Sequence, residues 1–365
     1  MPMKTTAGTH GEAVKGRGAA TNLEGRFETW QRDATDDGWF EEPGDEPLRL
    51  KTVIHIERAK SVISHNDSPD LGFSQSINPY RGCAHGCSFC FARPSHAYLG
   101  LSPGLDFETR LSAKTNAAEK LREELAKPGY KCETLVIGVN TDAYQPIERT
   151  YRITRSILEV ASECEQPVSL ITKSALIERD IDLLAPMAAK GLAAVTLSIT
   201  TLSNDISRYM EPRASAPARR LLAVKRLSEA GIPVNVNVAP VIPFLTDSEL
   251  EAILEAAAEA GAGTAAYTLL RLPWEVRPIF KDWLEKRFPL KAAHVMARVR
   301  EMRDGKENDP EFGSRMKGTG LFAQLLRQRF HKACARLGLD KRGETFQLDT
   351  TRFRPPSLHG QARLF

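Results

Sequence analysis

Short apolar runs alternate with amphipathic stretches between residue 74 and residue 290. Runs this apolar and this short are typical of parallel strands that helices cover on the outside. Six runs are predicted as strands: Ser74–Tyr80, Leu135–Val139, Val168–Thr172, Ala194–Ile199, Val234–Val238 and Ala265–Leu269. The alternation predicts an α/β fold, an open partial (β/α)6 barrel of the TIM type. A closed eight-strand barrel needs more chain, and a doubly wound sheet is the structural alternative.

Helix signals fall between and after these runs. The region Arg110–Lys127 predicts a helix with an apolar face, and Thr246–Glu249 predicts a capping box. Three glycines follow helical patterns, where a left-handed residue ends a helix: Gly191, Gly231 and Gly261. Beyond Trp283 the pattern is helical over Lys291–Arg303 and Met316–Leu337.

The pattern divides the chain into four regions. Residues 1–49 form an N-terminal extension, disordered to about residue 22 and then acidic. Its aromatic residues suggest that the acidic part lies along a surface: Phe27, Trp30, Trp39 and Phe40. Residues 50–290 form the barrel, residues 291–345 a basic helical cap, and residues 346–365 a tail that begins with a short strand.

Composition narrows the class of protein. With 365 residues, of which 42% are hydrophobic, the chain can bury a sizeable core. No apolar run approaches the roughly 20 residues that cross a bilayer, so no membrane partner is expected. Six cysteines do not form the evenly spaced set of a small secreted domain, which indicates a reducing cytoplasm.

Charge is distributed unevenly along the chain. Acidic residues dominate Glu24–Glu46 and basic residues dominate Arg315–Arg342, within a formal net charge of +4. The basic end can meet the phosphates of a nucleic acid. The alternatives are a solvated helix face, or docking against the acidic N-terminal segment.

Three cysteines lie close together in the segment that we call the cysteine loop, Cys83–Cys90. Cys83, Cys87 and Cys90 have the spacing Cys-x3-Cys-x2-Cys. Three thiolates can hold one metal centre and leave a position without a protein ligand, as a 4Fe-4S cluster with one open iron requires. The alternative is a zinc site with His85 or His96 as fourth ligand, although no second pair of closely spaced ligands is visible.

Polar side chains follow the predicted strands. In a βα barrel, chemistry gathers at the carboxyl ends of the strands, which makes these residues candidates for binding a small molecule. They are Asn140, Thr141, Asp142, Tyr144, Lys173, Ser198, Thr200 and Arg271. For each of them the alternative role is an ordinary cap or turn.

The cysteine spacing, with Phe89 just before the third cysteine, resembles the signature of the radical SAM superfamily. The resemblance implies an open (β/α)6 barrel and a 4Fe-4S cluster whose open iron chelates S-adenosylmethionine (SAM). It also implies that the reduced cluster cleaves SAM to a 5′-deoxyadenosyl radical. Lys173 or Arg271 can then pair with the SAM carboxylate, and Asp142 and the hydroxyl side chains with its amino and ribose groups.

Further motifs narrow the resemblance. Asn78–Cys83, Thr141–Glu148 and Thr172–Ser174 are similar to the spore photoproduct lyase-like branch, often labelled DNA repair photolyase. This implies cluster ligation by the three loop cysteines, SAM contacts near Thr141, Asp142, Lys173 and Ser198, and a DNA substrate. A one-electron donor such as flavodoxin or ferredoxin is the implied partner.

One departure from that branch concerns the thiol that returns hydrogen to the product. The lyase carries a cysteine near the end of its second strand, where this chain has Val139 and Asn140. Cys132 and Cys164 lie on the opposite, N-terminal side of the predicted barrel, away from the site. Cys334 is the remaining candidate for the hydrogen donor, and its alternative role is that of a small buried apolar side chain. Tyr98 and Tyr144 are the other catalytic candidates.

The last five residues, Gln361–Phe365, resemble the pentapeptide with which bacterial proteins dock on the replicative sliding clamp. Ala362 replaces the usual leucine, and a frayed or self-packed tail is the alternative. Together the patterns predict a radical SAM enzyme that acts on DNA. The alternatives are radical modification of RNA, protein or peptide, or a non-catalytic iron-sulfur or zinc module that docks on the clamp.

Overall fold

The computed structural model describes residues 14–27, 50–340 and 347–357. Its larger sheet has seven strands in the order β10-β9-β8-β7-β6-β3-β2. Their bounds are β2 Ile63–His65, β3 Gln75–Ile77, β6 Leu135–Ile137, β7 Val168–Thr172, β8 Ala193–Ser198, β9 Val234–Val241 and β10 Thr264–Leu269. All neighbouring pairs are parallel except β2 with β3.

The order of this sheet confirms the predicted barrel class. The six parallel strands from β3 to β10 follow one another in sequence order without reversal. A doubly wound sheet reverses its order at a switch point, which this sheet lacks. The sheet ends at β10 and β2 without closing, so the barrel is open.

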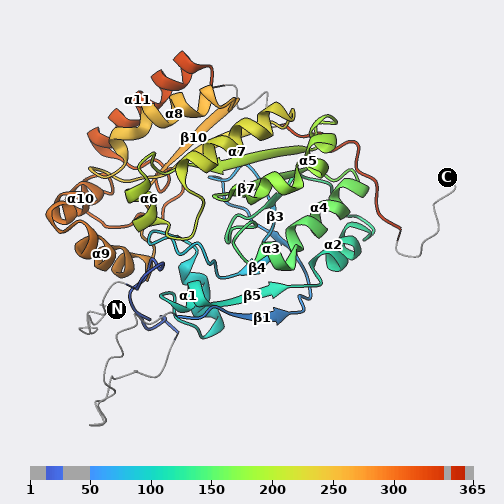
Figure 1. The fold of residues 1–365 in the computed structure, drawn as a ribbon, viewed down its shortest axis with the longest axis horizontal. Helices are drawn as coiled ribbons and strands as arrows, with labels where there is room; N and C mark the ends of the chain where they lie inside the picture. The colour runs from blue at the N-terminus through green and yellow to red at the C-terminus, as the bar shows by residue number, and fades with distance from the viewer. Residues whose placement is uncertain (1–13, 28–49, 341–346, 358–365) are drawn as a thin grey trace, which may run out of the picture.

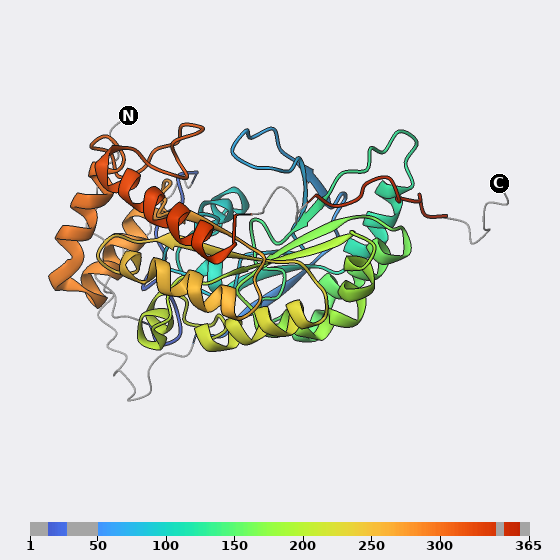
Figure 2. The ribbon, with the colours of Figure 1, turned by 90° about the horizontal axis from the view of Figure 1, so that it is seen from above.

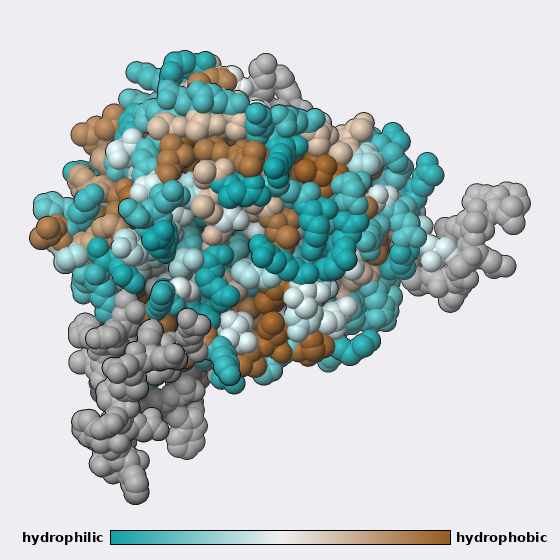
Figure 3. Space-filling model, viewed as in Figure 1, coloured by the Kyte–Doolittle hydropathy of each residue, from teal (hydrophilic) through white to brown (hydrophobic). Residues whose placement is uncertain are grey.

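Helices cover one side of the large sheet. Figures 1 and 2 show them along the outer side of the strands, and Figure 3 shows hydrophilic side chains over much of their exposed surface. Their bounds are α2 Ala117–Leu125, α3 Glu148–Tyr151, α4 Ile153–Glu163, α5 Ile181–Ala188, α6 Asn204–Met210, α7 Pro217–Glu229 and α8 Leu250–Glu259. The later helices are α9 Val276–Arg287, α10 Pro289–Glu301 and α11 Gly320–Leu337, and the short 3-10 helices are η1 Arg93–Leu99, η2 Ala175–Asp180 and η3 Asp247–Glu249.

Two apolar cores hold the molecule together. The larger core joins the strands to α2, α4, α7, α8 and α11. The smaller core packs Cys87 and Phe89 against α9, α10 and the segment after β10. The cysteine loop is therefore supported by the helical C-terminal part of the chain as well as by the barrel.

A second sheet, absent from the sequence prediction, lies beside the barrel. Its order is β1 (Val53–Glu57), β5 (Arg110–Lys114) and β4 (Tyr80–Arg81). The predicted helix over Arg110–Lys127 is therefore wrong at its start, where β5 pairs with β1 and α2 begins only at Ala117. Short α1 (Asp106–Thr109) leads into β5.

Three local predictions have different outcomes. The three helix-ending glycines are confirmed, with φ of 72° at Gly191, 76° at Gly231 and 92° at Gly261. The capping box is wrong, because Glu249 accepts hydrogen bonds from Thr201 and the Leu202 amide instead of from the Thr246 amide. Thr246 caps nothing either, since its hydroxyl accepts from the Ile242 amide.

The ends of the chain differ from the predicted disorder and strand. Residues 14–22 are packed on the protein, where Ala19 is buried, while residues 1–13 lie outside the described part. Phe27 stacks on Tyr98 with ring centroids 4.9 Å apart, and Trp30, Trp39 and Phe40 are not described. Residues 347–357 form no strand, and the clamp-like segment Gln361–Phe365 lies outside the described residues.

Within the described ranges, we find no helix that combines the length and apolarity needed to cross a bilayer.

Candidate active site

A cavity of about 490 Å³ lies at the carboxyl ends of the parallel strands. It is bounded by the cysteine loop on one side and by the segments after β6, β7 and β10 on the others. Eight of the predicted site residues line it: Cys83, Cys87, Cys90, Asn140, Asp142, Lys173, Ser198 and Arg271. The structure therefore brings together most of the residues that strand-end position singled out.

Backbone hydrogen bonds hold the cysteine loop in place. The Cys83 amide donates to the Phe107 carbonyl at 2.9 Å, and the Ala84 amide donates to Gln145 Oε1 at 2.8 Å. Gly82 has a φ of 71°, and a Cβ there would lie 2.7 Å from Leu111 Cδ2 and 2.8 Å from the Phe107 carbonyl oxygen. Only glycine fits this turn without displacing its neighbours.

A buried ion pair supports the loop from beneath. The Arg93 side chain is fully buried and donates to the carbonyls of Cys87, Pro103 and Gly104, and it pairs with Glu108 at 2.5 Å. Glu108 also accepts from the amides of Gly18 and Ala19. A Cβ at Gly18 would overlap the Gly86 carbonyl, so the N-terminal segment packs closely against the loop.

Three thiols are the donor set that a 4Fe-4S cluster with one open iron requires. All three line one cavity, and burial raises the pKa of Cys90 to about 11 and that of Cys87 well above its usual value. Among the described residues, no three His, Cys, Asp or Glu side chains are arranged to hold a single ion. A zinc ion needs sulfurs about 2.3 Å from one centre, whereas a cubane binds each thiolate through a different iron.

The two histidines of the zinc alternative have other contacts. His85 Nδ1 lies 3.3 Å from Asp142 Oδ2, and His96 Nε2 lies 3.0 Å from the Arg110 carbonyl oxygen. His85 lines the cavity and contacts Cys83, whereas His96 does not line it. The three thiols match the donor set of a 4Fe-4S cluster with one open iron.

Asp142 connects the ends of β6 and β7 within the cavity. It accepts hydrogen bonds from Thr172 Oγ1 at 2.6 Å and from the Lys173 amide at 2.8 Å. Burial disfavours the charged form of Asp142, but His85, the Thr172 hydroxyl and the Lys173 amide lower its pKa to about 2. Burial likewise disfavours protonated His85, yet Asp142 and Cys83 raise its pKa to about 10. Each partner thus favours the charged form of the other.

Lys173 is held in the cavity by a carboxylate. Its Nζ lies 3.6 Å from Glu211 Oε1 and 5.8 Å from the centre of the Phe89 ring. Glu211 also pairs with buried Arg220 and accepts from Thr200 Oγ1 at 2.7 Å. Burial opposes ionisation of Glu211, but Arg220 and Lys173 hold its pKa below the usual range. A cation is therefore presented beside the cysteine loop.

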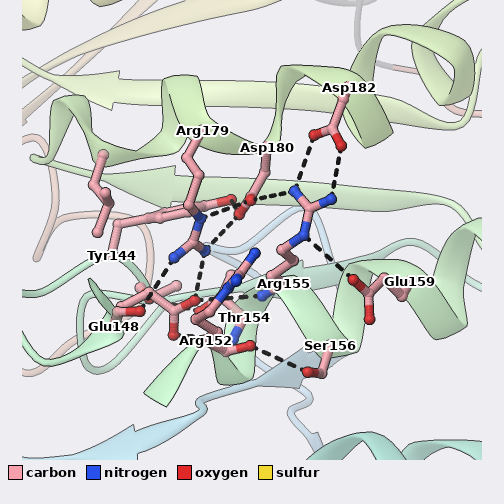
Figure 4. A network of polar contacts seen from close by, with 12 residues as sticks. Tyr144, Glu148, Arg152, Thr154, Arg155, Ser156, Glu159, Arg179, Asp180 and Asp182 are labelled. Atoms are coloured by element: carbon pink, nitrogen blue, oxygen red, sulfur yellow. Dashed lines mark hydrogen bonds and ion pairs between the residues drawn. The ribbon is translucent and has the colours of Figure 1, made fainter. Parts of the chain in front are cut away.

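Five predicted site residues do not line the cavity. Thr141 donates to the Tyr80 carbonyl and Thr200 to Glu211, so each supports a neighbour. Tyr98 is exposed on the surface, and Cys334, a residue of α11, is buried in the larger core. Tyr144 donates to Asp180 at 3.0 Å within a buried network that includes Arg179 and Glu148 (Figure 4).

Sequence reasoning missed two residues that line the cavity, Asn237 and Arg315, and one that supports a lining residue, Glu211. Glu211 follows α6 and acts through Lys173, and no local motif marks it. Asn237 lies within β9 and lines the cavity, but the hydrophobic pattern of this segment predicts only an apolar strand. Arg315 follows a polar linker and reaches the cavity only because the chain returns from α10 to the end of β10.

Comparison with known proteins places these features in a family. The family model of the radical SAM superfamily matches residues 77–257. An uncharacterized protein of Mycobacterium tuberculosis is 36% identical over 293 residues, which cover 75% of this chain and 84% of that protein. An uncharacterized protein of Methanocaldococcus jannaschii is 27% identical over 240 residues, covering 66% of this chain and 86% of that one.

Solved structures share the fold. Spore photoproduct lyase complexed with dinucleoside spore photoproduct has a TM-score of 0.55 at 14% identity, covering 78% of this chain and 79% of that one. A mutant of the same lyase with bound AdoMet and dinucleoside spore photoproduct has a TM-score of 0.53 at 16% identity, with the same coverage. At these identities the likeness concerns the fold.

Proposed function

The chain belongs to the radical SAM superfamily, and from that premise we propose an enzyme that binds a 4Fe-4S cluster and SAM and acts on DNA. The observation that carries the proposal is the meeting of three thiols, Lys173 and the Asp142–His85 pair in one cavity. When bound there, a reduced cluster with SAM on its open iron supplies a 5′-deoxyadenosyl radical, which takes hydrogen from a substrate.

Cys83, Cys87 and Cys90 would hold the cluster, and the chain's other residues would orient SAM. Lys173 is placed to pair with the SAM carboxylate, because Glu211 keeps a cation beside the cysteine loop. Asp142, Asn140 and Ser198 offer polar atoms to the amino and ribose groups. Thr141 and Thr200 act indirectly by fixing the backbone at Tyr80 and the Glu211 carboxylate.

The DNA substrate rests on the shared fold and on the cavity. Spore photoproduct lyase, which has this fold, binds a dinucleoside spore photoproduct. Repair by the same route is not part of the proposal, since it uses a protein thiol. All six cysteines and seven tyrosines lie within the described residues, yet only the three loop cysteines line the cavity.

The proposal also includes an electron donor, a cellular compartment and a docking partner. A flavodoxin or ferredoxin would reduce the cluster, and a reducing cytoplasm would protect it. Docking on the sliding clamp through Gln361–Phe365 would bring the enzyme to DNA, and deleting these residues should leave SAM cleavage unchanged.

Hydrogen transfer from DNA tests the proposed substrate. The reconstituted enzyme would be incubated anaerobically with SAM, dithionite and DNA that carries deuterated thymidine, with and without ultraviolet irradiation. Deuterium should appear in 5′-deoxyadenosine by mass spectrometry. Deoxyadenosine could instead stay unlabelled with every DNA and gain deuterium from labelled RNA or protein. That result would contradict DNA as the substrate and identify the labelled molecule in its place.

A further inference from the structure

Two of the four lysines and arginines of α11 form ion pairs within the protein. Arg329 pairs with Glu251 at 2.6 Å and donates to the Asp247 carbonyl, and Arg336 pairs with Glu255 at 2.5 Å. The acidic helix α8 thus neutralises part of the charge that the sequence alone assigns to a nucleic acid. A further source of positive charge lies in the cavity.

Arg271 lines the cavity with few partners of its own. It follows β10, its Nη1 lies 3.5 Å from Met316 Sδ, and its buried Nε has no hydrogen-bond partner. Its guanidinium lies 6.0 Å from the centre of the Phe91 ring, which also lines the cavity. A buried guanidinium donor without an acceptor is costly, and structures normally satisfy it.

The charges around Arg271 leave an excess of positive charge. Arg315 also lines the cavity. Asp70 forms an ion pair with Arg315 at 2.5 Å and accepts a hydrogen bond from the Gly313 amide at 2.7 Å. Burial, followed by Arg315 and Arg303, lowers the pKa of Arg271 to about 10. Asp70 and Asp309 oppose this shift, but Asp70 pairs with Arg315 and Asp309 accepts from the Ser314 hydroxyl. Among the described residues, neither carboxylate forms an ion pair with Arg271.

A second unpaired atom lies on the adjacent strand. Asn237 on β9 has a buried Oδ1 without a partner and lines the same cavity. An acceptor and a cationic donor in one cavity suit a ligand that carries both an anion and an N–H group. Phe91 and Phe73 add aromatic surface to the cavity lining, on which a planar base can stack.

Arg271 and Lys173 reach the cavity from different strands. Lys173 follows β7 and Arg271 follows β10, three strands away in the sheet order. Glu211 holds Lys173 close to Phe89 of the cysteine loop. We therefore assign the SAM carboxylate to Lys173, which leaves Arg271 for another anion.

We propose that Arg271, assisted by Arg315, binds a phosphodiester group of the nucleic-acid substrate, while Asn237 accepts a hydrogen bond from the adjoining base. This assignment rests on the proposed function and deepens it, because it identifies the part of the cavity that holds substrate. A guanidinium binds phosphate through two parallel N–H bonds, and its charge strengthens both. The substrate is thereby positioned by its backbone next to the cofactor.

The test compares two probes on the full chain in the presence of excess SAM. Thymidylyl-thymidine carries one phosphodiester, and its methylphosphonate analogue has the same shape without the charge. Calorimetry would give the affinity of each probe, and of SAM, for the wild type, Arg271→Gln, Arg271→Lys and the control Arg336→Gln, which changes an exposed pair on α11. Circular dichroism would verify that each variant is folded.

The proposal predicts that Arg271→Gln weakens thymidylyl-thymidine binding by roughly tenfold or more and leaves SAM affinity unchanged. The methylphosphonate should bind all four proteins alike, and Arg271→Lys should recover part of the loss. Equal affinities for both probes, no binding by the wild type, or a loss confined to SAM would overturn the assignment. Because binding needs no turnover, failure of SAM cleavage would count against the proposed function separately.

Discussion

At the scale of single residues, the cysteine loop depends on a glycine that no other residue can replace. Gly82→Ala forces a Cβ against Leu111 and the Phe107 carbonyl at a φ of 71°, whereas Gly129 has a φ of 82° with no atom near its Cβ position. Gly129→Ala should therefore cost only the backbone strain of about 1 kcal/mol, and Gly82→Ala clearly more. Urea unfolding of both variants measures the difference.

The same pair of variants separates loop geometry from general stability. Gly82→Ala should also lower the iron content after reconstitution, because its turn precedes Cys83, while Gly129→Ala should reconstitute normally. Equal unfolding free energies and equal iron contents would show that the contacts around Gly82 are not critical.

The Glu211 carboxylate is the second prediction at this scale. It is buried between Arg220, Lys173 and Thr200, so Glu211→Gln leaves buried cations unbalanced and should destabilise the fold by about 3 kcal/mol. Its pKa is lowered in the folded state, so its contribution is full above the ordinary glutamate pKa and is lost as pH falls through the folded value.

Unfolding of the apoprotein between pH 7 and pH 3 checks that dependence. The wild type should lose stability with falling pH more steeply than Glu211→Gln, which has no carboxylate left to protonate. Parallel pH profiles would mean that Glu211 is not ionised in the folded protein.

At the scale of elements, two loops meet across the open side of the barrel. The β2–β3 loop contributes Asp70 and Ser68, and the loop between α10 and α11 contributes Arg315, which contacts both. Asp70→Asn should increase hydrogen exchange in residues 66–74 and 309–316. Asp182→Asn, which removes an exposed partner of Arg155, serves as control and should leave both loops unchanged. Unaltered exchange in Asp70→Asn would show that the pair does not hold the loops together.

The elements also show what sequence can predict. Most of the parallel strands were predictable because they are short runs rich in apolar residues, and β7 matches its predicted bounds. The site followed from position, since Lys173 comes directly after β7 and Asp142 lies in the segment that follows β6. By contrast, the sequence did not predict β5, because its residues also fit a helical pattern. They form a strand because they pair with β1, which is distant in sequence. Arg315 reaches the cavity, and Glu211 reaches Lys173, through long-range packing that no local pattern encodes.

At the scale of the whole molecule, the distribution of charge predicts how DNA binding responds to salt. The net charge is only +4, and two of the three arginines of α11 are paired with α8. The proposed site contacts one phosphate, so the logarithm of affinity for a short single strand should fall with the logarithm of salt concentration with a slope of about −0.7. Fluorescence anisotropy across a salt series measures it. A slope several times steeper would indicate a broad basic surface instead.

The central claim is that the three loop cysteines assemble a cluster that cleaves SAM, and one measurement tests it most directly. Full-length protein, reconstituted anaerobically with iron and sulfide, would be mixed with SAM and dithionite, and 5′-deoxyadenosine would be quantified beside bound iron. The wild type should hold roughly four irons per chain and form deoxyadenosine, and Cys87→Ala should form none. A wild-type protein that binds zinc, shows no iron-sulfur absorbance and yields no deoxyadenosine would contradict the account.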